Sequence, residues 1–212
     1  MQVVTREVGA FAANCHIVWE DPAKALVVDP GAEPEAICEE LRKRGLRPAA
    51  VLLTHGHVDH IGGVAGLLSV FPCPVFLAPE DAAWCFTSAN DFPPYPPQRD
   101  RPADLRPVAE LAAADLGGLA VEVIPTPGHS PGCVCCRVTS PGDAMGLLLT
   151  GDTLFAGSIG RTDFHGGDMR AMGASLRTLA SLPEDLAVLP GHGPSTAIGH
   201  EKDTNPFLEN LP

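Results

Sequence analysis

The chain has 212 residues, of which 45% are hydrophobic, so it can bury a substantial core in one domain or at most two small ones. Its formal net charge of −12, from 14 basic and 26 acidic residues, disfavours bulk electrostatic attraction to nucleic acid or to a membrane of anionic lipid. An anionic substrate would therefore need a local basic pocket or a metal ion.

The sequence carries no sign of export or of membrane insertion. Its first eight residues lack the apolar segment of a signal peptide, and no apolar run approaches the roughly 20 residues of a membrane span. The seven cysteines are an odd number, and three of them cluster at 133–136. This usage favours buried free thiols over a disulfide framework, so we expect a cytoplasmic protein.

The N-terminal half begins with strands and continues with alternating helices and strands. Three strand patterns, at residues 2–8, 14–20 and 25–28, predict an antiparallel meander. The segments that follow predict βαβ character, with helices at 33–44, 63–70 and 80–86 and strands at 49–53 and 73–78.

Residues 87–107 differ from their surroundings because they contain six prolines and no regular apolar pattern. They predict a long loop without regular elements. Two interpretations remain open. The segment is either a surface connection that packs Phe92 and Tyr95, or a segment that covers a substrate.

The C-terminal half repeats the order of strands followed by mixed strands and helices. Strands are predicted at 119–125, 133–138, 145–150 and 186–190, and a short helix is predicted within 200–211. A longer helix is predicted over 168–182, with Asp168 as its N-cap and one apolar face made by Met169, Met172, Leu176 and Leu179. Two similar halves indicate two sheets face to face with helices outside.

The densest cluster of chemically active side chains lies at residues 55–60. Three imidazoles and one carboxylate follow the apolar strand pattern at 49–53 directly: His55, His57, Asp59 and His60. In α/β folds the ends of strands carry the functional side chains. This density indicates a metal site.

Three further residues of the same chemical types follow other predicted strands, namely His129, Asp152 and His192. Imidazole and carboxylate donors without thiolate suit zinc, manganese or iron(II) in a reactive site. Seven donors exceed the needs of one tetrahedral ion, whereas two ions that share a bridging carboxylate would use all seven. Such a pair of ions promotes hydrolysis at neutral pH.

The run His55-x-His57-x-Asp59-His60, followed by His129, Asp152 and His192, resembles the metallo-β-lactamase superfamily. The resemblance covers about residues 2–208. It implies an α/β (α+β) fold, a four-layer αββα sandwich that forms one domain over 1–212, with the metals at one edge of the sheets. It also implies that His55, His57 and His129 hold the first metal, that Asp59, His60 and His192 hold the second, and that Asp152 bridges them.

Within this superfamily, the segments 151–164 and 190–196 and the run Asn205-Pro206-Phe207 resemble the glyoxalase II and persulfide dioxygenase branches. The first resemblance implies a hydroxyacylglutathione hydrolase that cleaves a glutathione thioester such as S-D-lactoylglutathione. The attacking group would be a metal-bridging hydroxide, with Asp59 and Asp152 as catalytic residues. Two divalent ions are implied, zinc foremost, with iron or manganese as alternatives.

The chain departs from larger glyoxalase II enzymes, which add a C-terminal helical domain with basic residues that bind glutathione. Only a short form of the enzyme is therefore expected. Arg161 and Lys202 are the candidate substrate-binding residues, although Arg161 could pair with Asp163 and Lys202 could lie in solvent. Two other functions stay open: an iron-dependent persulfide dioxygenase acting on glutathione persulfide, and a metal-binding scaffold without activity. The oligomeric state is also open.

Overall fold

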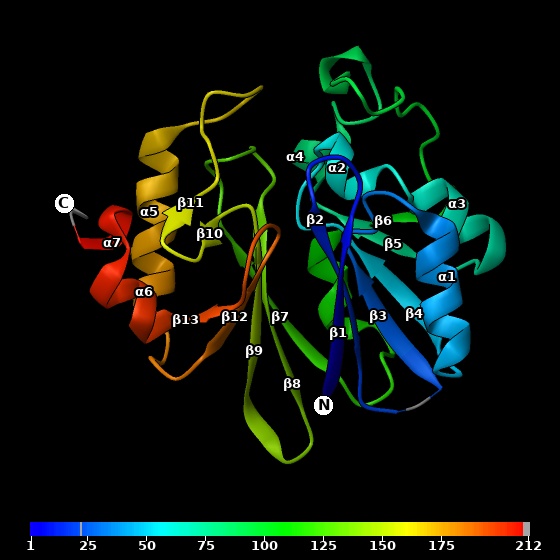
Figure 1. The fold of residues 1–212 in the computed structure, drawn as a ribbon, viewed down its shortest axis with the longest axis horizontal. Coiled ribbons are helices and arrows are strands. Elements are labelled where there is room, and N and C mark those ends of the chain that lie inside the picture. Colours follow the sequence, from blue (N-terminus) through cyan, green and yellow to red (C-terminus); the bar gives the residue numbers. More distant parts are fainter. Residues whose placement is uncertain (22, 210–212) are drawn as a thin grey trace.

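The computed structural model describes residues 1–21 and 23–209, and it contains two β-sheets that face each other (Figure 1). The first sheet has six strands in chain order: β1 (Gln2–Val8), β2 (Ala13–Trp19), β3 (Lys24–Val28), β4 (Arg47–Leu52), β5 (Val75–Leu77) and β6 (Leu105–Pro107). Its first three strands pair antiparallel, which confirms the predicted meander. The strands from β3 to β6 pair parallel, as βαβ connections require.

The second sheet has five strands in the order β13-β12-β9-β8-β7. They are β7 (Ala120–Pro125), β8 (Val134–Ser140), β9 (Asp143–Gly151), β12 (Ala187–Pro190) and β13 (Thr196–Ala197). β12 runs parallel to β9, and the other pairs are antiparallel. A separate small hairpin joins β10 (Leu154–Phe155) to β11 (Ser158–Ile159).

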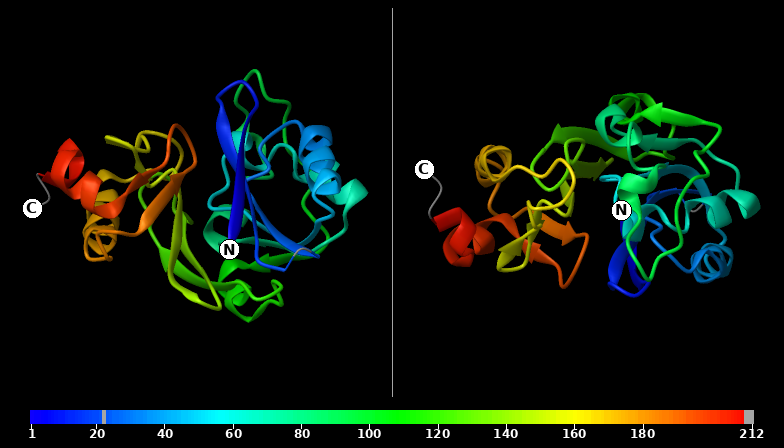
Figure 2. Two further views of the ribbon diagram at one scale, coloured as in Figure 1. Left: turned by 60° about the horizontal axis from the view of Figure 1, so that its bottom comes forward. Right: turned by 90° about the horizontal axis from the view of Figure 1, so that it is seen from above.

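Helices cover the outer face of each sheet, as the two further views show (Figure 2). α1 (Pro34–Lys43) and α3 (Val64–Val70) lie outside the first sheet, and α5 (Met169–Ala180), α6 (Ile198–Thr204) and α7 (Pro206–Glu209) lie outside the second. The remaining helical turns are short: α2 (Val58–Ile61), α4 (Pro79–Ala82) and the 3₁₀ segments at Ser88–Asn90 and Val108–Ala113. The order helix, sheet, sheet, helix confirms the predicted four-layer sandwich.

Three apolar clusters hold these layers together. Because side chains alternate along a strand, Ile17 of β2 packs under the helices of its own sheet while Val18 packs between the two sheets. On β9, Leu149 faces the same inter-sheet cluster and Leu148 faces α5. Full burial of each such side chain stabilises the fold by about 1.5–3 kcal/mol.

Two predictions about individual segments were wrong. Residues 87–107 are not free of regular structure, because Leu105–Pro107 forms the edge strand β6. Proline is tolerated there because an edge strand has N–H groups that need no partner. Met169 is 50% exposed and does not belong to the buried face of α5, since it occupies the first helical turn, ahead of the contact with the sheet. The predicted N-cap is confirmed, since the Asp168 side chain accepts hydrogen bonds from the N–H groups of Arg170 and Ala171.

The strand ends explain where the functional side chains gather. β4, β9 and β12 all end at the upper edge of the two sheets in Figure 1, and the β7–β8 loop lies at the same edge. Within the described residues, none of the helices has both the length and the apolar character needed to cross a bilayer.

Candidate metal centre and its cavity

Two glycines allow the strand ends to come together at this edge. Gly151, the last residue of β9, has φ +46, and a Cβ there would lie 2.3 Å from Oγ1 of Thr54 at the end of β4. A Cβ on Gly191, just after β12, would lie 2.3 Å from Oδ1 of Asp152. Neither position has room for a side chain, so glycine is what lets the three strand ends approach.

The approach brings six of the predicted donors into two groups. His55, His57 and His129 form one group, and Asp59, His60 and His192 form the other. Within each group the donor atoms lie within 4.8 Å of one another. Nδ1 of His57 is 2.8 Å from Nε2 of His129, and Nε2 of His60 is 3.2 Å from Nε2 of His192.

Asp152, the seventh predicted donor, lies between the two groups. Its Oδ2 is 3.4 Å from Nε2 of His129 in the first group and 3.5 Å from Nε2 of His192 in the second. Its Oδ1 is 3.4 Å from Nε2 of His60. One carboxylate thus reaches both groups, which is the position that a bridging ligand needs.

Four imidazoles are oriented by acceptors that bind their Nδ1 atoms. Nδ1 of His60 lies 3.1 Å from Oδ2 of Asp29, and Nδ1 of His129 lies 2.7 Å from the Arg161 carbonyl oxygen. Nδ1 of His192 lies 3.1 Å from the carbonyl oxygen of Phe11. Since carboxylate and carbonyl oxygens only accept, each Nδ1 carries a proton, and Nε2 is the ring atom left to ligate a metal ion.

His55 reaches the same state through a hydroxyl group. Oγ1 of Thr54 donates to Oδ2 of Asp29 at 2.6 Å, so it can only accept from Nδ1 of His55 at 3.1 Å. Nε2 of His55 therefore keeps a free lone pair, which is available to a metal ion in the first group. This arrangement of protons is the one that metal-binding histidines require.

The buried polar atoms also fit a pair of metal ions. Nε2 of His55 and Oδ1 of Asp152 are buried, and neither has a hydrogen-bond partner among the described residues. Burial of such atoms without a partner is costly, and ligation of a cation would remove the cost. The donor set supports a dinuclear metal site and suits zinc, iron(II) or manganese.

The two groups differ in charge. Burial and the neighbouring His129 lower the pKa of His57 to about 3, and burial holds the pKa of His55 well below its usual value. Burial also acts to lower the pKa of His60, but Asp152, Asp59 and Asp29 outweigh it and raise that pKa to about 10. The first group thus favours neutral imidazole, whereas the second is rich in carboxylate. Metal binding at the second group therefore displaces a proton.

Two supporting carboxylates were missed by sequence reasoning. Asp29 directly follows β3, is buried and also accepts a hydrogen bond from the backbone N–H of Thr54 at 2.8 Å. An aspartate directly after a buried strand was the available signal. Asp81 is fully buried and accepts hydrogen bonds from the backbone N–H groups of Gly56 and Gly132, in the two loops that carry the first group. Nothing in its sequence setting distinguishes it from a surface residue of a helix.

A cavity of about 600 Å³ opens beside the donors. His57, Asp59, His129, Asp152 and His192 all line it. Residues 89–92, 159–161, 164 and 165 also line it, so part of the proline-rich 87–107 segment faces this cavity.

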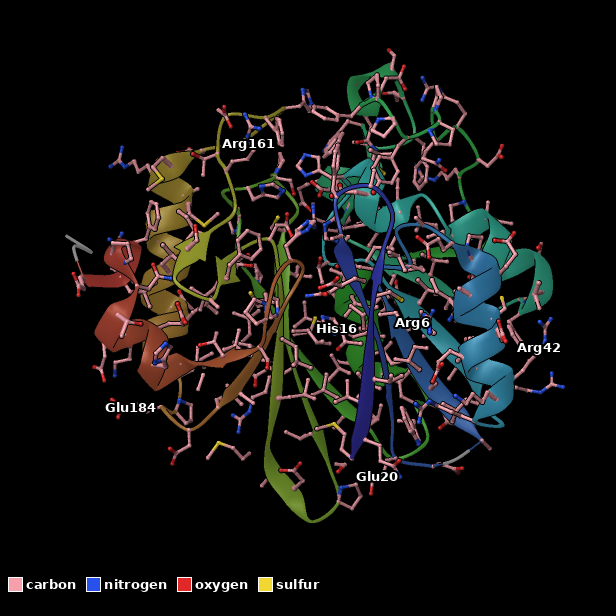
Figure 3. The ribbon with its side chains drawn as sticks, in the orientation of Figure 1. Arg6, His16, Glu20, Arg42, Arg161 and Glu184 are labelled. Atoms are coloured by element: carbon pink, nitrogen blue, oxygen red, sulfur yellow. The ribbon has the colours of Figure 1, made fainter. Side chains whose placement is uncertain are left out.

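The structure separates the two predicted substrate-binding residues. Arg161 lines the cavity, where its guanidinium makes two hydrogen bonds to Asp163, at 2.6 and 2.7 Å, as the ion-pair alternative anticipated. Lys202 binds Glu184 at 2.7 Å. Lys202 is not among the described residues that line the cavity, and Figure 3 shows its partner Glu184 at the lower left, away from Arg161 near the top.

The sequence profile described as the Metallo-beta-lactamase superfamily matches residues 8–192. The chain belongs to this superfamily. The match contains all seven donors, so the metallo-beta-lactamase superfamily accounts for both the sandwich and the edge at which the donors meet.

Several proteins are similar to this chain along nearly its whole length. Hydroxyacylglutathione hydrolase GloC of Haemophilus influenzae is 34% identical over 218 residues, which cover 99% of each chain. The crystal structure of BLEG-1, a B3 metallo-beta-lactamase, superposes with a TM-score of 0.86 at 36% identity and covers 98% of this chain and 99% of BLEG-1. The structure of TTHA1623 in a di-iron-bound form gives a TM-score of 0.82 at 38% identity and covers 98% of this chain and 100% of TTHA1623.

These similarities and the donor geometry agree on the class of protein. The relatives include hydrolases, and the di-iron form of TTHA1623 is consistent with a site for two ions. The resemblance to the glyoxalase II-like branch is supported by the similarity to GloC. The chain accordingly belongs to a superfamily that includes metallo-hydrolases, and its donor set supports a dinuclear metal site.

Proposed function

We propose that this protein is a glyoxalase II-type thioester hydrolase that cleaves a glutathione thioester such as S-D-lactoylglutathione. The observation that carries the proposal is the placement of Asp152 between two groups of donors at the wall of a cavity. No serine, threonine or cysteine is among the described residues that line this cavity, so none of them offers a hydroxyl or thiol side chain as the attacking group. Water activated at the donors is the nucleophile that this arrangement supports.

The residues divide the work as follows. His55, His57 and His129 would hold one ion, Asp59, His60 and His192 the other, and Asp152 both. When bound, two divalent ions supply acidification of water and polarisation of the scissile carbonyl. Asp59 and Asp152 are the carboxylates that both line the cavity and contact these imidazoles. They would orient the attacking water by accepting hydrogen bonds from it.

Thioester chemistry suits a site without a further acid. The leaving thiol has a pKa of about 8.5, so it departs as thiolate without a proton donor. Arg161 is the only lysine or arginine among the described cavity-lining residues, and it would contact a glutathione carboxylate. The similarity to GloC, a hydroxyacylglutathione hydrolase over the same length, supports this choice of substrate class.

The test is thioester hydrolysis measured together with metal content. Protein loaded separately with zinc, manganese or iron(II) is assayed with S-D-lactoylglutathione by release of free thiol, and the metals are counted per chain. We expect turnover with two ions per chain. Asp152→Ala should lower kcat/KM by at least roughly 100-fold and release metal, because the carboxylate contacts both groups.

A matched control is Asp91→Ala, which removes another cavity-lining carboxylate that instead pairs with Arg99 at 2.6 Å. It should retain both metals. Three outcomes would refute the proposal. One iron per chain with oxygen consumed on glutathione persulfide would identify a persulfide dioxygenase. Absence of turnover on any thioester at full metal loading would identify a scaffold. Unchanged turnover in Asp152→Ala would remove the bridging role.

A further inference from the structure

Three aromatic rings from separate segments meet across the cavity. Phe11 comes from the β1–β2 turn, Phe92 from the proline-rich segment and Phe164 from the loop before α5, and all three line the cavity. The ring centroids of Phe11 and Phe92 are 5.6 Å apart, and those of Phe92 and Phe164 are 5.7 Å apart. Both pairs meet edge to face, the favoured geometry for aromatic contacts. We call these three rings the aromatic bracket.

The aromatic bracket contacts the first group of metal-type donors through a ring and the second group through the backbone of Phe11. The ring centroid of Phe164 lies 5.4 Å from that of His57, in the first group. The carbonyl oxygen of Phe11 accepts a hydrogen bond from Nδ1 of His192, in the second group, at 3.1 Å. When the reacting atom of a substrate lies between the two groups, the substituents attached close to that atom are therefore the ones that reach the bracket.

Tyr95 holds the bracket in place. Its hydroxyl accepts a hydrogen bond from the backbone N–H of Phe11 at 3.3 Å, and its ring centroid lies 5.2 Å from that of Phe11. A Cβ on Gly9, whose φ is +72, would lie 2.2 Å from the same hydroxyl, so the turn can close on Tyr95 only with glycine there. This contact pre-organises the bracket and lowers the entropy lost when a ligand binds.

Two of the bracket rings are unusually open to solvent for large apolar side chains, since Phe11 is 40% exposed and Phe92 is 45% exposed. Adjacent exposed rings at the mouth of a cavity mark a binding surface for an apolar group. A charged acyl group finds no lysine or arginine left to pair with, because Arg161 is the only one among the described cavity-lining residues. Its guanidinium pairs with Asp163, lies over the Phe164 ring at 4.0 Å and, in the proposed function, serves the glutathione carboxylate. The wall next to the donors therefore suits an apolar group better than an ionic one.

We propose that the aromatic bracket binds the acyl group of the thioester and selects bulky apolar acyl groups over small ones such as lactoyl. The inference rests on the proposed function for the identity of the scissile bond. The acyl substituent is attached directly to the carbonyl carbon, whereas the charged groups of glutathione lie many bonds away. Because the bracket contacts the donors themselves, the acyl side is the part of the substrate that reaches it.

The test compares two acids that differ only by phenyl in place of methyl, D-mandelate and D-lactate. Their affinities for the zinc-loaded protein are measured by calorimetry, and kcat/KM is measured for the corresponding S-D-acylglutathiones. We expect D-mandelate and its thioester to be preferred by roughly tenfold, the scale on which an apolar pocket discriminates. Phe92→Ala and Phe11→Ala should each bring the preference close to parity.

The control is Phe207→Ala, because Phe207 is an equally exposed phenylalanine, at 39%, that lies on α7 and is not among the described residues lining the cavity. It should keep the preference. If an alanine variant fails to fold or to bind two metals, Phe92→Leu and Phe11→Leu replace it, since leucine keeps apolar volume but removes the ring.

The outcomes separate the two proposals. Equal affinity for the two acids in the unaltered protein would overturn the role of the bracket, even if both thioesters are hydrolysed. A preference that survives intact in both bracket variants would overturn it as well. Preferred binding of D-mandelate that depends on Phe11 and Phe92, with neither thioester hydrolysed, would support the bracket and refute the proposed function.

Discussion

The buried carboxylate of Asp81 should be one of the largest single contributors to stability near the metal centre. It accepts four hydrogen bonds: from the N–H groups of Gly56 and Gly132 at 2.8 Å each, from the Ser130 hydroxyl at 2.6 Å and from the Trp84 indole at 3.2 Å. Gly56 lies between two donors of the first group, and Ser130 follows the third. Asp81 therefore joins the two loops from which that group is built.

The substitution Asp81→Asn keeps the shape of this side chain but turns one acceptor oxygen into a donor. Each oxygen serves two donors, so two of the four hydrogen bonds are lost whichever way the amide is oriented. A buried hydrogen bond to a charged group contributes about 1.5–3 kcal/mol, so the loss should amount to roughly 3–6 kcal/mol. Metal affinity at the first group should fall by roughly 10–100-fold, as is usual when a supporting residue is removed.

The measurements are urea unfolding of the chelated protein and zinc titration of the refolded protein. Ser130→Ala removes only one of the four contacts and should cost about 1.5–3 kcal/mol. Asp104→Asn, at an exposed carboxylate that pairs with Arg106, should leave the unfolding midpoint unchanged. A loss below about 1 kcal/mol in Asp81→Asn, with normal zinc affinity, would refute the reasoning.

Three other expectations concern the core, the thiols and the metals. Leu176→Ala should lower the free energy of unfolding by about 2–5 kcal/mol because Leu176 is fully buried under the second sheet, whereas Met169→Ala on the same helix should change it by less than about 0.5 kcal/mol. Burial, with a smaller contribution from Asp104, raises the pKa of the Cys73 thiol to about 11 from the ordinary 9.0, so less thiolate is present at pH 8. A thiol reagent should therefore label Cys73 in the native protein about 100-fold more slowly than a free cysteine, and the labelling rate should rise with pH up to about 11. Chelation should lower the melting temperature and zinc should restore it, since the donor groups exist only in the folded chain; an equal melting temperature with and without chelator would contradict a dinuclear site.

Much of the fold was predictable from periodicity. The apolar run at 49–53 and the helical pattern at 168–182 correspond to β4 and α5, because each packs on a large apolar surface that leaves a clear mark in the sequence. The short elements were not predictable. β10 and β11 have two residues each, and β6 is an edge strand whose prolines contradict strand propensity, so tertiary pairing alone defines them.

The candidate site was predictable to a different extent. The seven donors are chemically distinctive and follow strand ends, so the sequence indicated which residues would gather, and the structure brings them together. The assignment of Lys202 to substrate binding relied on its charge alone. The sequence does not show where the cavity lies, so it does not show whether an exposed helix residue such as Lys202 is near it. Asp81 and the aromatic bracket depend on contacts between segments far apart in the chain, which leave no local pattern.

The acceptors that orient the imidazoles show why part of such a site is invisible in a sequence. His60 is oriented by the side chain of Asp29, so a residue without a side-chain acceptor at position 29 would lose the contact. His129 and His192 are oriented by the backbone carbonyls of Arg161 and Phe11, which every residue possesses. Substitutions at 11 and 161 can therefore alter the cavity wall while the carbonyls still hold both imidazoles. This separation lets the wall of the cavity change with the substrate while the metal donors stay in place.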